Sequence, residues 1–146
     1  MDVSTKEKIV ADAVARMDES YHCSEAILLA AAGHYVPNLD PLAVRLSTPF
    51  AGGVGCSHME LCGALAGGLL LIGAQYGRED AHTNDDLCQE LSLQWRERFL
   101  QEFGDIRCQD LRENWVGQPG QPDCKALVAR ATGLLADFME EAVRKA

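Results

Sequence analysis

The hydrophobic positions of this chain recur at three- and four-residue spacing, and few segments alternate as strands do. Start and stop signals divide this pattern into helices. Ser4 and Glu7 form a capping box for a first helix that should end near residues 18–20. A second helix is expected over about residues 21–32, with Gly33 as its stop. The N-terminal region is therefore predicted to be helical throughout.

The middle of the chain contains a short and a long predicted helix, separated by a glycine-rich loop. Asp40 and Pro41 begin the short helix, which Pro49 closes. The flexible loop covers residues 51–55, and the long helix should run over about residues 57–76. Its glycines are Gly63, Gly67, Gly68 and Gly73. Each costs roughly 0.5–1 kcal/mol relative to alanine, so this helix should gain its stability from tight packing at the centre of a bundle.

Start signals also divide the C-terminal third. Asn84, with two aspartates after it, begins a helix that Gly104 stops. Asp105 should cap a short turn that contains Cys108, and Asp123 begins the last helix after an exposed loop. The sequence thus predicts an all-α fold for residues 1–146, a single-domain bundle of about five to seven helices around the glycine-rich helix.

The charge balance and the apolar segments narrow the choice of partners. Thirteen basic and 22 acidic residues give a net charge of −9, which argues against binding to nucleic acid. The uncharged run over residues 61–74 is shorter than the roughly 18 residues that suggest a membrane span, so no membrane insertion is expected. The N-terminus lacks a basic run followed by an apolar stretch, and we therefore expect a cytoplasmic protein.

Six cysteines in a reducing compartment point to catalysis or metal binding rather than fixed disulfides. Four of them stand at or near predicted helix starts: Cys23, Cys62, Cys108 and Cys124. A helix start favours the thiolate and can lower a cysteine pKa from about 8.5 into the range of roughly 3.5–7.5. By the predicted bounds, Cys62 lies one turn inside its helix, where this effect is weaker.

Other residues are weaker candidates. His58 and Cys62 are four residues apart and could share one helix face as metal ligands, with Cys56 nearby. No CxxC pair is present, so any disulfide or metal site must combine distant segments. Plain core packing remains the alternative for any single cysteine, and Cys88 fits it best. His22, His34 and His82 are expected to be ordinary surface or capping residues.

The cysteines also stand within an ordered series of short motifs. These are Cys23 in His-Cys-Ser-Glu-Ala, the loop Gly52-Gly53-Val54-Gly55, Cys62-Gly63-Ala64-Leu65-Ala66-Gly67, Phe103-Gly104 ahead of Cys108, and Cys124. Together they resemble the redox-active proteins labelled C_GCAxxG_C_C, over about residues 20–140. The resemblance implies a redox role for the four family cysteines. Cys56 and Cys88 lie outside this pattern.

Three hypotheses follow. In the first, the clustered cysteines carry out thiol-disulfide chemistry as a thiol oxidoreductase, with a redox partner or a small molecule; a thiolate such as Cys62 attacks and a second cysteine resolves. In the second, the four family thiolates hold a metal such as zinc, or an iron–sulfur cluster. In the third, the protein is a helical interaction subunit, in which a homo-oligomer is possible and the cysteines are only structural.

Overall fold

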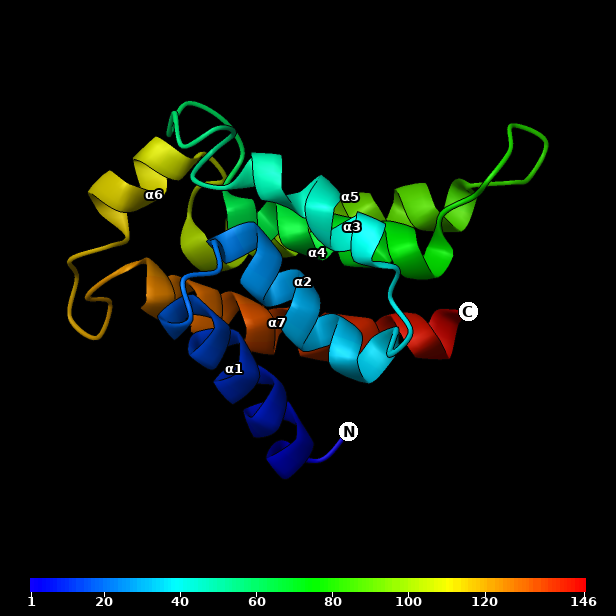
Figure 1. Cartoon of the computed structure of the whole chain (residues 1–146), viewed down its shortest axis with the longest axis horizontal. Helices are drawn as coiled ribbons and strands as arrows, with labels where there is room; N and C mark the ends of the chain where they lie inside the picture. Colours follow the sequence, from blue (N-terminus) through cyan, green and yellow to red (C-terminus); the bar gives the residue numbers. More distant parts are fainter.

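The computed structural model describes residues 1–146 and contains seven α-helices, one short 3-10 helix and no strand (Figure 1). The helices are α1 (Val3–Asp18), α2 (Cys23–Tyr35), α3 (Pro41–Ser47), α4 (Gly63–Tyr76), α5 (Asp86–Phe103), α6 (Cys108–Asn114) and α7 (Cys124–Lys145), and the 3-10 helix is η1 (Thr48–Phe50). The predicted all-α fold is confirmed.

Helices α2 and α4 form the centre of the bundle. They pack against each other, α1 packs against α2 and α7, and α5 covers α4. Large side chains fill the space between α4, α5 and α7, among them Trp95, Phe99 and Phe138. The indole N–H of Trp95 donates a 3.1 Å hydrogen bond to the Leu65 carbonyl, which satisfies the polar atom of this buried ring.

Two glycines of α4 permit this close packing. A Cβ on Gly67 would collide with Ile27 Cγ2 and would lie 2.7 Å from the Ser24 carbonyl oxygen of α2. A Cβ on Gly68 would collide with the Trp95 ring of α5. Gly73, by contrast, has nothing within 4 Å of the position of a Cβ. The prediction that the glycine-rich helix packs tightly at the centre is therefore right for its first half.

Several helices begin or end at the capping residues that the sequence indicated. The Asp40 carboxylate accepts from the Leu42 amide at 2.8 Å, and Asp123 accepts from the Ala126 amide at 2.9 Å. Gly104 ends α5 with a φ of 80°. None of the helices combines the length with the apolar composition that a membrane crossing requires.

Other predicted boundaries are wrong. Helix α4 begins at Gly63 rather than near residue 57, because the backbone has positive φ as far as His58. His58 and Cys62 consequently do not share a helix face. Helix α2 continues through Gly33 to Tyr35, and the side chain of Asp2, not that of Ser4, caps α1.

Candidate functional site

Each of the four family cysteines lies at the start of a helix. Cys23, Cys108 and Cys124 are the first residues of α2, α6 and α7, and Cys62 is the N-cap of α4. The predicted placement at helix starts is therefore confirmed for all four. Cys62 lies closer to its helix start than the sequence predicted, since α4 begins later.

These four cysteines line a single cavity of about 240 Å³. It lies at the end of the bundle where the loop before α4, helix α6 and the start of α7 come together (Figure 1). The loop contributes Cys56 and His58, the weaker candidates of the sequence analysis. Cys88 lies elsewhere and packs against the hydrophobic core, as expected for a structural residue. We call this cavity, with its five cysteines, the thiol cavity.

Close contact between α2 and α4 positions the two innermost thiols. A Cβ on Gly63 would collide with Cys23 Sγ, so glycine at this position allows the starts of the two helices to meet. Backbone N–H groups of Gly52 and Ser24 face the Cys23 sulfur, and those of Ala64 and Leu65 face the Cys62 sulfur. The amides that face Cys62 act to lower its pKa, in opposition to burial. They do not form a capping hydrogen bond with the Cys62 side chain.

Burial dominates the acid-base behaviour of these thiols. It raises the pKa of Cys62 to about 12, and neighbouring Cys23 adds to this rise by charge repulsion. Burial is also the main cause that raises the pKa of Cys23 and of Cys108. The expectation that helix starts would lower the thiol pKa is therefore wrong for Cys23, Cys62 and Cys108, because desolvation outweighs the amides.

The same electrostatic couplings show which sulfurs are neighbours. The charge of Cys124 raises the pKa of both Cys23 and Cys108, while Cys108 also responds to Cys56. All six cysteines are free thiols, and no group of three or more side chains has the arrangement of a metal site. Cys108 and Cys124 thus lie in the same group as Cys23, around one cavity.

A left-handed turn forms one wall of the thiol cavity. The five consecutive residues from Gly52 to Cys56 have φ between 54° and 72°. A Cβ on Gly53 would lie 2.6 Å from Cys108 Cβ, so glycine is required there. The turn is tied to α6 because the amide of Cys108 donates to the Glu60 carbonyl at 2.9 Å and that of Gln109 donates to the His58 carbonyl at 2.8 Å.

Three residues other than glycine in this loop adopt the left-handed conformation: Val54, Cys56 and His58, with φ of 70°, 55° and 63°. This conformation costs an L-residue roughly 1–2 kcal/mol, and a β-branched residue such as Val54 adopts it rarely. Such strain persists only where the surrounding structure enforces it, and it is concentrated at functional sites. The left-handed conformation of these three residues is therefore a local strain beside the thiol cavity.

Sequence reasoning missed two polar residues of the cavity. His22, expected to be an ordinary surface or capping residue, is the N-cap of α2 and lines the cavity. Arg112 lines it from α6 and lowers the pKa of Cys108, though less than burial raises it. The spacing of four residues between Cys108 and Arg112 could have predicted this neighbour, because residues i and i+4 share a helix face.

The protein is an all-α bundle in which five of the six free cysteines line one cavity. The family model described as "Putative redox-active protein (C_GCAxxG_C_C)" matches residues 21–138. The chain belongs to this family. No curated protein and no solved structure matches it.

Proposed function

We propose that the protein is a cytoplasmic thiol oxidoreductase that exchanges its cavity thiols with the disulfide of a small molecule or of a redox partner. The observation that carries this proposal is the gathering of four helix-starting cysteines around one cavity. Cysteines that only filled a core would not need to share a cavity. The strained loop over the site supports the same conclusion.

Burial distinguishes the roles of the thiols. Cys62 has a pKa of about 12 and is almost entirely a thiol at neutral pH, which makes it a poor first nucleophile. Cys124, the first residue of α7, is only partly buried, whereas Cys62 and Cys108 are buried, so the Cys124 sulfur is more open to an incoming disulfide. We therefore assign the first attack to Cys124 and the resolving step to its neighbour Cys108.

The exchange takes place in two balanced steps. The Cys124 thiolate attacks one sulfur of a disulfide R–S–S–R, which forms a mixed disulfide and releases R–S⁻. The Cys108 thiolate then attacks the Cys124 sulfur, which forms the Cys108–Cys124 disulfide and releases the second R–S⁻. The two protons of the protein thiols pass to the two R–S⁻ groups. The protein dithiol is oxidised by two electrons, and R–S–S–R is reduced to two thiols.

Single serine variants of the reduced protein test these roles. Mixed with bis(2-hydroxyethyl) disulfide and followed by intact mass, Cys108→Ser should accumulate the mixed disulfide at Cys124. Cys124→Ser should lose rapid exchange. Cys88→Ser, which alters a thiol outside the cavity, is the matched control and should react as the unaltered protein does. Equal rates and products in all four proteins, with equal helix content by circular dichroism, would overturn the proposal.

A second candidate function is metal binding, which the same gathering of thiols favours. Thiolates suit zinc and iron–sulfur clusters, so the donor chemistry of the four family cysteines fits, although no preformed set of three ligands exists. Binding would have to deprotonate thiols whose pKa burial raises, and would therefore release protons. A titration of the reduced protein with zinc, followed by native mass and proton release, tests this alternative. A tight complex with one zinc that Cys62→Ser abolishes would favour it.

A further inference from the structure

The thiol cavity differs in charge from the rest of this acidic molecule. The chain has 22 acidic and 13 basic residues, yet no aspartate or glutamate lines the cavity. Arg112 is the only lining residue with a permanent charge, and His22 and His58 are the other ionisable nitrogen groups. A protein of net charge −9 thus lines this cavity with a cation and with no carboxylate.

The guanidinium of Arg112 has no partner within the protein. Six of the nine arginines form ion pairs, as in the contacts of Arg98 with Glu141 and of Arg130 with Glu102 at 2.7 Å, whereas Arg112, like Arg45 and Arg144, forms none. Arg112 forms neither an ion pair nor a side-chain hydrogen bond. Beside the cavity it also lines a separate depression with Glu113 and Asp123, but neither carboxylate pairs with it. Its five N–H donors are therefore free for a ligand.

The remaining wall is apolar and the space is small. Side chains of Met17, Leu111, Val116, Leu127 and Val128 line it. A volume of about 240 Å³ lies below the roughly 300–1,000 Å³ of pockets for drug-sized ligands. A short organic chain would fill it, with its stem on the apolar wall and an anionic end on the guanidinium. Arginine pairs with a carboxylate in a planar, two-bond geometry, which fixes orientation as well as charge.

Arg112 also lies at a suitable place relative to the reacting sulfurs. It follows Cys108 by four residues on α6, which separates the two Cβ atoms by about 5–6 Å. A carboxylate bound to Arg112 would hold a nearby sulfur of the same molecule beside Cys108 and Cys124, both of which line the cavity. The Arg112 guanidinium would then both select the substrate and orient its disulfide.

We propose that the thiol cavity is a substrate site for small organic disulfides that carry a carboxylate, with Arg112 as the residue that binds it. This inference rests on the proposed thiol-disulfide function. The covalent steps are those given above, with R a short chain ending in a carboxylate. Arg112 binds the carboxylate in both steps and exchanges no proton.

Three symmetric disulfides of similar size test the proposal: 3,3′-dithiodipropionate, bis(2-hydroxyethyl) disulfide and cystamine, which end in a carboxylate, a hydroxyl and an ammonium group. Each rate with the reduced full-length protein is divided by the rate of the same disulfide with dithiothreitol, an uncharged thiol, which corrects for intrinsic reactivity. We expect the carboxylate to be preferred over the hydroxyl by about tenfold, which corresponds to about 1.4 kcal/mol. Without a cationic site the order would be reversed, since a net charge of −9 repels the dianion.

Substitutions at Arg112 locate the source of the preference. Arg112→Gln should reduce the ratio of carboxylate to hydroxyl rates about tenfold, Arg112→Lys should retain part of it, and Arg112→Glu should favour cystamine. Arg130→Gln, which removes the same charge from an exposed site on α7 outside the cavity, is the matched control and should keep the ratio. A normalised ratio near one, or an equal ratio in Arg112→Gln, would overturn the inference alone. No exchange with any of the three disulfides would overturn the proposed function as well.

Discussion

The two ends of helix α4 are built on different principles. Its N-terminal end continues from the left-handed loop that carries Cys56 and His58 over buried thiols. Its C-terminal end leads into the loop before α5, which projects from the opposite end of the bundle (Figure 1). No residue in this second loop has a positive φ. One helix thus connects a strained end with an unstrained one.

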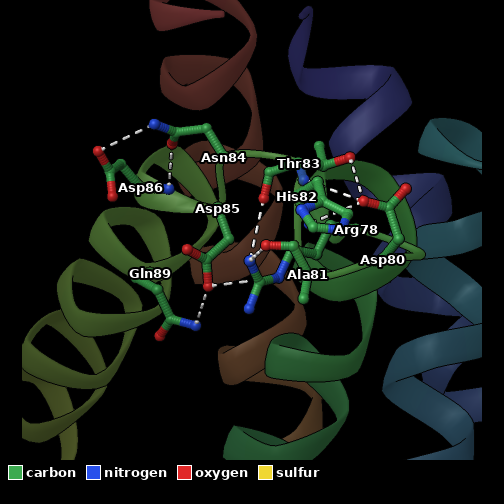
Figure 2. A network of polar contacts seen from close by, with 9 residues as sticks. All are labelled: Arg78, Asp80, Ala81, His82, Thr83, Asn84, Asp85, Asp86 and Gln89. Atoms are coloured by element: carbon green, nitrogen blue, oxygen red, sulfur yellow. Dashed lines mark hydrogen bonds and ion pairs between the residues drawn. The ribbon is translucent and has the colours of Figure 1, made fainter.

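The unstrained end is closed by short-range polar contacts (Figure 2). Arg78 donates to the carbonyls of Ala81 and Thr83 at 3.2 and 3.0 Å, and the Asp80 carboxylate accepts from the His82 amide at 2.9 Å. Such turns suit residues whose side chains form hydrogen bonds with the nearby backbone, and residues 77–84 of this loop stay exposed. The comparison teaches that the strain in this fold is not a general cost of its turns. Val54, Cys56 and His58 lie at the end where the family thiols meet, and Ser20, the other non-glycine residue with a positive φ, lies in the turn that leads to Cys23.

The largest effect is expected from one added methyl group at two positions of α4. Gly67→Ala would place a Cβ 2.7 Å from the Ser24 carbonyl oxygen of α2, and should lower the free energy of unfolding by about 1–3 kcal/mol. Gly73→Ala meets open space and should raise it by about 0.5–1 kcal/mol, because alanine is the better helix former. Urea unfolding of the two variants measures both values. Equal effects would show that the close contact of α2 and α4 does not constrain the first half of the helix.

The second prediction concerns alkaline pH and the buried thiol at the strained end. Cys62 keeps its proton in the folded protein up to about pH 12, whereas an ordinary cysteine in the unfolded chain loses it near pH 9.0. Above pH 9 the unfolded state therefore binds fewer protons, and the free energy of unfolding should fall by up to about 1.4 kcal/mol per pH unit. Under reducing conditions, unfolding at pH 8, 9 and 10 measures this slope. Cys62→Ser should show a shallower fall of the free energy of unfolding with pH, because only other groups then contribute to it. Identical slopes in the two proteins would show that Cys62 is not held protonated in the folded state.

The sequence predicted the features of this fold that have local causes. Asp40 and Asp123 cap their helices through their own side chains, and Gly104 ends α5 in the left-handed conformation that glycine favours. The left-handed turn before α4 was not predictable in this way. The β-branched residue Val54 rarely adopts a positive φ, and backbone bonds to α6 help to fix the turn. The start of α4 was predicted wrongly for the same reason, whereas its end at Tyr76 was predicted correctly.

The candidate site also combines features that have local causes with features that depend on the folded molecule. Capping and stop signals placed Cys23, Cys108 and Cys124 at or near helix starts, and the family pattern added Cys62, which the predicted bounds had placed one turn inside its helix. The direction of their pKa shifts could not, since it depends on how deeply Cys23 and Cys62 are buried once four helices meet. Arg112 lies between these cases: its spacing from Cys108 was visible in the sequence, but its lack of a partner is a property of the folded molecule.

The third prediction tests the strain directly. Val54→Gly should raise the free energy of unfolding by about 1 kcal/mol, because glycine adopts a φ of 70° without the steric cost that valine bears. Ala81→Gly, in the unstrained loop, keeps the carbonyl that accepts from Arg78 and should lower stability by about 0.4–1 kcal/mol through added freedom of the unfolded chain. Opposite signs in urea unfolding are the expected result. A loss of stability in both variants would mean that the left-handed turn is not strained at Val54.

The smallest effect is expected in the unstrained loop between α4 and α5. Arg78→Ala removes the hydrogen bonds to Ala81 and Thr83 and a 3.9 Å contact with Asp85. All of these are exposed, so the free energy of unfolding should fall by no more than about 1 kcal/mol. The rate of exchange with bis(2-hydroxyethyl) disulfide should not change, because this loop and the thiol cavity are at opposite ends of α4. A changed exchange rate with unchanged stability would show that α4 couples its two ends, and the division between a functional and a structural end would have to be abandoned.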